Sequence, residues 1–175
     1  MMSGDFMNKL VIVINGSGGV GKDTLCELAS KHFRVYNVSS ITPIKEIASR
    51  CGWNGAKDDR SRRFLSDLKA LLVGYNNYPT IWAKERFLEF MDSDDQIMFL
   101  HIREPEEIAK FVEATGGVAR TLLIRGGDRM TKAHYGNRSD DEVENYNYDL
   151  YFTNDKTLPE AEVEFCNMLS GILGK

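Results

Sequence analysis

The sequence predicts an α/β fold in which a five-stranded parallel sheet carries helices on both faces. Five short apolar runs alternate along the chain with longer stretches whose apolar residues recur at helical spacing. Strands that alternate with helices favour a parallel sheet built from right-handed crossovers. The first run, Leu10 to Ile14, leads through a glycine-rich loop into a helical pattern. Ligands of such sheets bind beyond the carboxyl ends of the strands, which directs attention to that loop.

Each expected strand is a short apolar run, and the first is continuous and β-branched, as in strands covered by helices on both faces. The five are Leu10 to Ile14, Arg34 to Ser39, Gln96 to Ile102, Val118 to Ile124 and Asp149 to Thr153. The chain has no internal repeat, low-complexity tract or linker composition. We therefore expect a single domain over residues 9–175, preceded by a flexible leader over residues 1–8.

Each of the four prolines begins a helical pattern, where its fixed φ and missing N–H do least harm. They are Pro43, Pro79, Pro105 and Pro159. Thr157 and Glu160 flank the last of them at capping-box spacing. One further helix is expected from about Leu25, and another from about Ser61 to Tyr75. The inner face expected for this last helix comprises Phe64, Leu65, Leu68, Leu71 and Leu72.

Composition favours a small molecule as the partner. Of 175 residues 42% are hydrophobic, enough for one sizeable core, and the net charge is −4. Binding to nucleic acid or to an anionic membrane needs a dominant basic surface, so neither is expected. No apolar stretch reaches membrane-spanning length, and the N-terminus lacks the apolar core of a signal peptide. We therefore expect a cytoplasmic protein.

The cysteines indicate the same compartment. Cys26, Cys51 and Cys166 are odd in number and far apart, and each lies in an expected helix among apolar residues. This pattern is typical of reduced thiols in a core. No spacing of cysteine and histidine suggests a zinc site.

The glycine-rich loop has the pattern GxxxxGK, from Gly16 to Lys22, between a strand and a helix. In that context backbone N–H groups converge on phosphate oxygens at the positive end of the helix. Lys22 adds a mobile cation for the β- and γ-phosphates of a nucleotide. A glycine-rich turn without function would explain neither the spacing nor the lysine. The expected phosphate-binding residues are Gly16, Ser17, Gly18, Gly19, Val20, Gly21, Lys22, Asp23 and Thr24.

One position departs from this pattern. The residue after the lysine is normally Ser or Thr, whose hydroxyl binds Mg²⁺, but here it is Asp23, followed by Thr24. Asp23 could hold the metal directly or through water, since Mg²⁺ accepts carboxylates and keeps several waters. Alternatively, Asp23 is a first-turn acid favoured by the helix dipole, and Thr24 carries the metal role.

Polar residues follow the strands at the edge where a second substrate would bind. Ser39, Ser40 and Lys45 follow the second strand, whereas His101 and Arg103 follow the third.

After the fourth strand comes the polar stretch RGGDRMTKAHYGNR, from Arg125 to Arg138, which is too long for a simple turn. Phosphoryl transfer needs positive charge and a cover that excludes water, so we interpret residues 125–142 as a lid. The alternative is a solvated surface loop. Ser139 to Glu142 form a capping-box helix start within the expected lid.

These residues resemble the nucleoside monophosphate kinase group of P-loop proteins. The resemblance rests on GKDT, on S-x-x-x-P-I-K from Ser39 to Lys45, on Arg103 and on the arginine-bearing fourth connection. It is nearest to phage-type deoxynucleoside monophosphate kinases and animal-type phosphomevalonate kinases, which also carry aspartate after the lysine. It implies a three-layer P-loop NTPase fold with a lid. It also implies transfer of the γ-phosphoryl group of ATP·Mg²⁺ to a phosphomonoester, most simply a nucleoside or deoxynucleoside monophosphate.

The resemblance also implies roles for single residues. The residues acting on the transferring group would be Lys22, Arg103, Arg125 and Arg129, and those meeting the acceptor would be Ser39, Lys45 and Arg103. Asn154 and Asp155 would line the adenine pocket, through backbone groups more than through side chains. Plainer alternatives are an Arg103 pair with Glu106 or Glu107, a solvated Lys45 and a simple Asn-Asp turn.

His101 stands where related kinases often have an aspartate. A neutral imidazole is a poor Mg²⁺ ligand, so the metal task would pass to Asp23, Glu104 or water. The plainer interpretation is a strand-end histidine hydrogen-bonded to a neighbour. Together with Asp23, this departure leaves open a degenerate kinase that binds ATP without efficient transfer. A nucleotide-dependent switch is a second alternative, although the sequence has no Asn-Lys-x-Asp motif for guanine and no convincing Asp-x-x-Gly switch motif.

Overall fold

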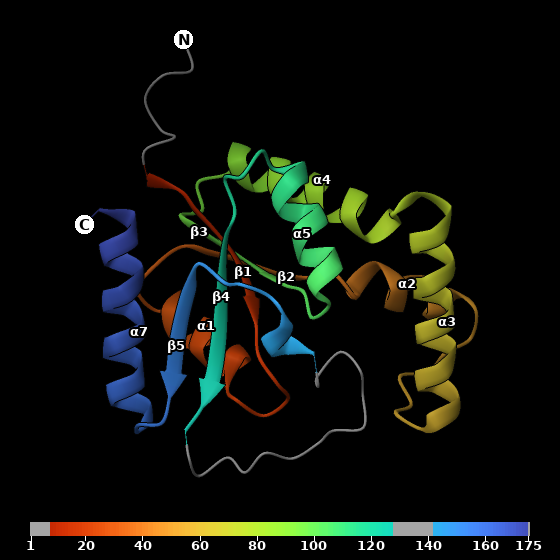
Figure 1. The fold of residues 1–175 in the computed structure, drawn as a ribbon, viewed down its shortest axis with the longest axis horizontal. Coiled ribbons are helices and arrows are strands. Elements are labelled where there is room, and N and C mark those ends of the chain that lie inside the picture. Colours follow the sequence, from red (N-terminus) through yellow and green to blue (C-terminus); the bar gives the residue numbers. More distant parts are fainter. Residues whose placement is uncertain (1–7, 128–141, 175) are drawn as a thin grey trace.

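A single parallel sheet forms the centre of the molecule (Figure 1). The computed structural model describes residues 8–127 and 142–174. The spatial order of the strands is β2-β3-β1-β4-β5, and every neighbouring pair is parallel. Their bounds are β1 (Leu10–Asn15), β2 (Val35–Ser39), β3 (Ile97–His101), β4 (Arg120–Gly126) and β5 (Leu150–Asn154). The predicted five-stranded α/β fold is confirmed.

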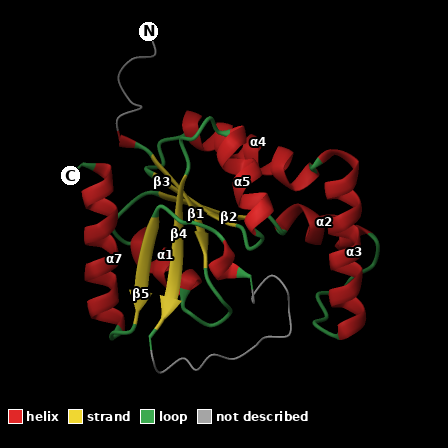
Figure 2. Cartoon of the chain, viewed as in Figure 1, coloured by secondary structure: helices red, strands yellow, loops and turns green. Residues whose placement is uncertain are grey.

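Helices cover both faces of the sheet (Figure 2). Those described are α1 (Lys22–Ser30), α2 (Thr42–Arg50), α3 (Asp59–Asn76), α4 (Tyr78–Asp92), α5 (Pro105–Ala114), the short 3-10 helix η2 (Val143–Asn145) and α7 (Leu158–Leu173). Side chains of β1 alternate between two buried clusters, which produces three layers. Ile12 packs with residues of α1 and α7, whereas Val13 packs with residues of α4 and α5.

The proline-initiated helices form as predicted. Proline occupies one of the first two positions of α2, α4, α5 and α7. At the start of α7 the capping box is complete, with Thr157 and Glu160 bonded to each other's backbone. These helix starts were readable from sequence because each depends on a few consecutive residues.

The inner face predicted for α3 is only partly formed: Leu65, Leu68 and Leu72 are half-buried, whereas Phe64 and Leu71 are exposed. None of the residues of α3, all of which the structure describes, is buried, and Leu71 is 69% exposed. The helix packs beside α2 and α4 at one end of the molecule and does not cover the sheet (Figure 1). Periodicity predicted the helix correctly but not what lies against it.

The fourth strand is displaced along the chain relative to its prediction. It begins at Arg120 and continues through Gly126, because β5 pairs with it as far as Gly126 opposite Asn154. Val118 is 55% exposed and precedes the strand. Arg125 therefore belongs to the sheet and not to the connection that follows it.

Two further expectations are only partly met. All three cysteines are free thiols, and Cys26 is buried, but Cys51 lies exposed just after α2. The core position expected for Cys51 is thus wrong, because α2 ends one residue before it.

Residues 1–7 of the expected leader, and residues 128–141 of the expected lid with its capping-box segment, lie outside the described residues. Within the described part, no helix is long and apolar enough to cross a membrane.

Candidate functional site

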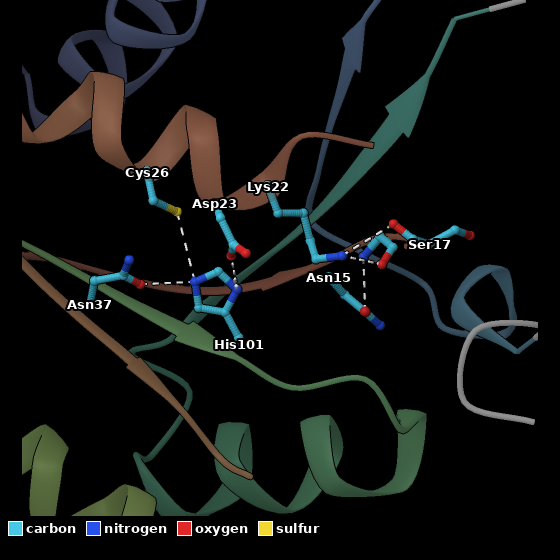
Figure 3. Close-up of polar contacts among 8 residues, drawn as sticks. Asn15, Ser17, Lys22, Asp23, Cys26, Asn37 and His101 are labelled. Atoms are coloured by element: carbon cyan, nitrogen blue, oxygen red, sulfur yellow. Dashed lines mark hydrogen bonds and ion pairs between the residues drawn. The ribbon is translucent and has the colours of Figure 1, made fainter. Parts of the chain in front are cut away.

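The glycine-rich loop joins the carboxyl end of central strand β1 to the first turn of α1. Gly21 precedes the helix with φ of 90°, and the Lys22 ammonium donates to the backbone oxygens of Gly16 and Ser17 (Figure 3). The lysine thus lies over its own loop. The first N–H groups of any helix have no partner within that helix, and helix N-termini of this kind commonly bind anions. This geometry suits a loop that wraps polyphosphate.

Two glycines in the loop are required by their surroundings. A Cβ on Gly16 would lie 2.5 Å from the backbone oxygen of Ile124, which cannot move without shifting β4. A Cβ on Gly21 would lie 2.6 Å from Nδ2 of Asn154. Both clashes come from strands that are distant in sequence, so the loop packs closely against β4 and β5.

Asn154 clamps the loop from the end of β5. Its Nδ2 donates to the backbone oxygen of Val20 at 2.9 Å. Asp155 packs so closely against Gly127 that a Cβ there would lie 2.4 Å from the Cβ of Asp155. The structure therefore gives the Asn154 side chain a contact with the phosphate-binding loop. The adenine role expected for Asn154 and Asp155 stays a prediction.

Gly21→Ala should weaken ATP binding about tenfold. Alanine at this position would have to adopt the left-handed backbone conformation of Gly21, which costs about 1–2 kcal/mol. Its Cβ would also displace the Asn154 amide. Titration calorimetry with ATP·Mg²⁺ measures the effect. Gly171→Ala in α7 is the matched control, because its Cβ would meet nothing within 4 Å. Unchanged ATP affinity in Gly21→Ala would show that the loop adjusts freely.

His101 lies at the end of β3 between the loop and β2. Its Nε2 is 2.8 Å from Oδ1 of Asn37, and its Nδ1 is 3.8 Å from Oδ1 of Asp23 (Figure 3). Asn37 and Asp23 thus lie beside the two different ring nitrogens of His101. Burial lowers the pKa of His101; Asp23 opposes that shift, whereas Lys22 and Arg103 reinforce it.

A second contact closes the buried side of this histidine. The Sγ of Cys26 lies 3.8 Å from Nε2, and burial raises the pKa of this thiol to about 12. Cys26 is therefore a neutral packing residue. The expected hydrogen bond between His101 and a neighbour is present, with Asn37 as the partner.

Asp23 and Thr24 both lie exposed in the first turn of α1, and the choice between them as the metal residue stays a prediction. The Asp23 carboxylate is 90% exposed and faces His101 from the first turn of α1. An exposed carboxylate beside a polyphosphate loop suits Mg²⁺, which takes oxygen ligands and retains water. Thr24 is also exposed, one residue further around the helix. The residues present fit the magnesium ion that ATP carries.

The residues expected at the acceptor side lie on three different elements. Ser39 ends β2 opposite His101 in the register, and exposed Arg103 follows β3. Lys45 lies on the exposed side of α2. There it lines an open depression of about 570 Å³ with Thr42, Glu46, Ser49 and Arg50. The structure brings Ser39 beside the histidine and leaves Lys45 on the rim.

Two acids after β3 hold a lysine from α3. The Lys69 Nζ lies 2.7 Å from Oε2 of Glu104 and 3.2 Å from Oε1 of Glu107. Glu107 is buried, which raises the pKa of its carboxyl, and its Oε2 has no hydrogen-bond partner among the described residues. Glu107 thus pairs with Lys69, where the sequence suggested Arg103. Glu104, an alternative metal residue, is committed to the same ammonium.

Arg125 is held in an ion pair with Glu144. Its guanidinium forms two bonds with the Glu144 carboxylate, at 3.0 and 2.8 Å, and lies 4.6 Å from the ring centre of Tyr151. The hydrogen-bonded pair raises the pKa of Arg125 and lowers that of Glu144. Contact with a transferring phosphoryl group would require this pair to break. Arg129 lies outside the described residues.

Sequence reasoning missed the buried amide of Asn15. This side chain, with no exposed surface, bonds to Gly16, to the backbone of Arg103 and to Tyr148. A polar residue that ends an otherwise apolar strand, directly before the loop, was the available signal. Its partners could not be inferred from sequence, since two of them lie more than 80 residues away.

Two solved kinases have the same architecture as this chain. A gluconokinase from Sinorhizobium meliloti 1021 aligns over 96% of this chain and 95% of its own, with a TM-score of 0.52 and 14% identity. An APS kinase from Mycobacterium tuberculosis aligns over 93% and 98%, with a TM-score of 0.50 and 13% identity. The fold is that of the P-loop kinases.

A third solved structure with this architecture is named for a resistance phenotype and not for a kinase activity. A tunicamycin resistance protein from Deinococcus radiodurans aligns over 95% of this chain and 96% of its own, with a TM-score of 0.56 and 11% identity. Neither a protein-family model nor a curated protein sequence matches this chain. At these identities the likeness establishes the P-loop kinase fold and leaves the acceptor open.

Proposed function

We propose that this chain is an ATP-dependent kinase that transfers the γ-phosphoryl group to a phosphomonoester, most simply a nucleoside or deoxynucleoside monophosphate. The observation that carries the proposal is the placement of Lys22 and its glycine loop beside the end of β3, where His101 faces Asp23 (Figure 3) and the backbone of Arg103 is bonded to Asn15. Asn15, which directly precedes the loop, bonds to Gly16 and to the backbone of Arg103, so the cations Lys22 and Arg103 belong to segments that meet at one edge of the sheet. Phosphoryl transfer between two anionic substrates needs that concentration of positive charge.

The strand-end chemistry favours a phosphate oxygen as the nucleophile. A hydroxyl acceptor benefits from a general base, but Glu104 and Glu107, two acids that follow β3, are bound to Lys69. A phosphomonoester is already ionised at neutral pH and needs no base. Cations and positioning then suffice for transfer.

In the proposed reaction the loop and its lysine hold the donor. Lys22 exchanges the oxygens of Gly16 and Ser17 for the β- and γ-phosphates of ATP, while amides of the loop and first helical turn bind phosphate oxygens. Arg103 meets the acceptor phosphate. Asp23 would hold the Mg²⁺ of the nucleotide, which neutralises charge on the phosphates when bound.

A coupled ADP-release screen tests this function. Nucleoside and deoxynucleoside monophosphates and phosphomevalonate form the phosphate-bearing arm, and gluconate and shikimate form the hydroxyl arm. We expect acceptor-dependent turnover in the first arm alone. Turnover with only a hydroxyl acceptor would replace the proposed acceptor class. ATP binding without any acceptor-dependent release would favour a switch or a degenerate kinase.

Asp23→Asn should raise the Mg²⁺ concentration needed for half-maximal activity by about tenfold. The amide keeps the size of the side chain but removes the charge that attracts the cation. Activity measured across a Mg²⁺ titration gives the shift. Glu27→Gln, which neutralises another exposed acid of α1, is the control and should leave the titration unchanged. Equal curves for Asp23→Asn and wild type would return the metal role to Thr24.

A further inference from the structure

The side chain of Asn15 joins three segments at the carboxyl edge of the sheet. It ends β1 and is completely buried in a strand whose other residues are apolar. Its Oδ1 accepts from the backbone N–H of Gly16 at 2.8 Å. Its Nδ2 donates to the backbone oxygen of Arg103 at 2.9 Å and to the hydroxyl of Tyr148 at 2.8 Å. Both hydrogens of the amide are used, and these partners fix its orientation.

The bonds continue beyond Asn15. The Tyr148 hydroxyl donates to the backbone oxygen of Val143 at 2.7 Å, in η2. Both residues are at least nine-tenths buried. The network therefore runs from the start of the phosphate loop, through the turn after β3, to the segment that precedes β5. Asn15, Tyr148 and Val143 are buried, so a broken bond among them would leave a costly unpaired group.

The two ends of the Asn15 amide bond to segments that would bind different substrates in the proposed reaction. Oδ1 holds Gly16, whose backbone is already confined by the Ile124 oxygen. Nδ2 holds the backbone of Arg103, the residue expected to meet the acceptor. In-line transfer depends on the separation of donor and acceptor sites, and errors near 1 Å cost about a hundredfold in rate. One rigid side chain sets that separation here.

We infer that Asn15 is a positioning residue that fixes the phosphate-binding loop and the Arg103 turn relative to each other. This inference rests on the proposed function for its acceptor half, whereas its donor half concerns ATP binding alone. A buried asparagine that merely satisfies local hydrogen bonds would stabilise the fold without changing either substrate constant. The experiment must therefore separate stability from binding.

Three variants make that separation. Asn15→Leu keeps the branching at Cγ and removes all three bonds of the amide, whereas Tyr148→Phe removes the third of them together with the bond from Tyr148 to Val143. Thr115→Val is the matched control. The Thr115 side chain is buried and donates to the oxygens of Phe111 and Val112, but it lies at the far end of α5 from Arg103. Its loss should destabilise the fold without touching the site.

ATP affinity, measured by calorimetry well below the melting temperature of every variant, is the first readout. We expect about tenfold weaker binding in Asn15→Leu, about threefold weaker in Tyr148→Phe and unchanged affinity in Thr115→Val. Equal ATP affinities in all three would overturn the inference. If Asn15→Leu does not fold, the comparison of Tyr148→Phe with Thr115→Val decides in the same way.

Turnover with the acceptor found in the screen is the second readout. We expect kcat to fall at least about tenfold in Asn15→Leu and to stay within about twofold of wild type in Thr115→Val. An unchanged kcat in a folded Asn15→Leu would overturn the acceptor half. A wild-type protein without turnover would instead refute the proposed function, and the ATP titrations would still test the donor half.

Discussion

Lys22→Ala should lower the rate of phosphoryl transfer by at least about a hundredfold while leaving the fold intact. Removing one preorganised cation or donor from a developing charge costs about 10²- to 10³-fold. The Lys22 ammonium donates to the backbone oxygens of Gly16 and Ser17 in its own loop, and the residue belongs to neither buried cluster of the sheet, so we expect the fold to survive its loss. Steady-state ADP release and a thermal melt measure the two effects.

Lys31→Ala is the control for that substitution. Lys31 is a 60% exposed lysine that follows α1 and pairs with Glu162, far along the helix from the loop. It should retain wild-type turnover. If Lys22→Ala transferred phosphate at the original rate, the loop would not be the donor site and the proposed kinase would be refuted.

Lys69→Met should reduce the free energy of unfolding by about 3 kcal/mol at neutral pH. The ammonium is only 16% exposed and is shared by the carboxylates of Glu104 and Glu107. Removing one partner of a buried ion pair leaves an uncompensated charge, a change that typically costs about 3–5 kcal/mol. Urea unfolding measures the loss. Lys156→Met, in an exposed pair with Glu164, is the control and should cost less than about 1 kcal/mol.

The cost of Lys69→Met should depend on pH in a defined direction. The pKa of Glu107 is raised in the fold, chiefly by burial, above its ordinary value of 4.5. The folded state thus holds this proton to higher pH than the unfolded chain, and stability falls as pH rises above 4.5. Without the Lys69 ammonium, the ionised form of Glu107 is even less stable relative to the protonated form. The deficit of the variant should therefore shrink as pH falls toward 4.5, and Glu107→Gln added to Lys69→Met should recover part of it. A deficit independent of pH would contradict this account.

The helix starts and the phosphate loop could be predicted because each is encoded by consecutive residues. Proline at the first positions of a helix and the Thr157 to Glu160 capping box act over one turn. The loop from Gly16 to Lys22 combines a strand, glycines and a helix within a few residues. Such patterns survive whatever surrounds them, and the structure confirms the predicted secondary structure around each.

Predictions failed where a distant element decides the outcome. The apolar spacing of α3 predicts an inner face, yet the helix packs at the side of the molecule and leaves Leu71 largely exposed. Arg125 was expected in a loop, but pairing with β5 extends β4 past it, and Glu144 binds its guanidinium. Strand length and helix coverage depend on partners that periodicity does not specify.

By itself, the sequence determined the α/β class, the strand that leads into a phosphate loop, and the lysine that loop presents. Only the tertiary structure decided what surrounds the loop: Asp23 beside His101, Asn154 on Val20, and Asn15 between Gly16 and Arg103. The physical reason is the distance along the chain between the residues that interact. Backbone conformation follows from steric and hydrogen-bonding preferences of neighbouring residues, whereas these side-chain contacts form when the parallel sheet brings the ends of separate strands to one edge.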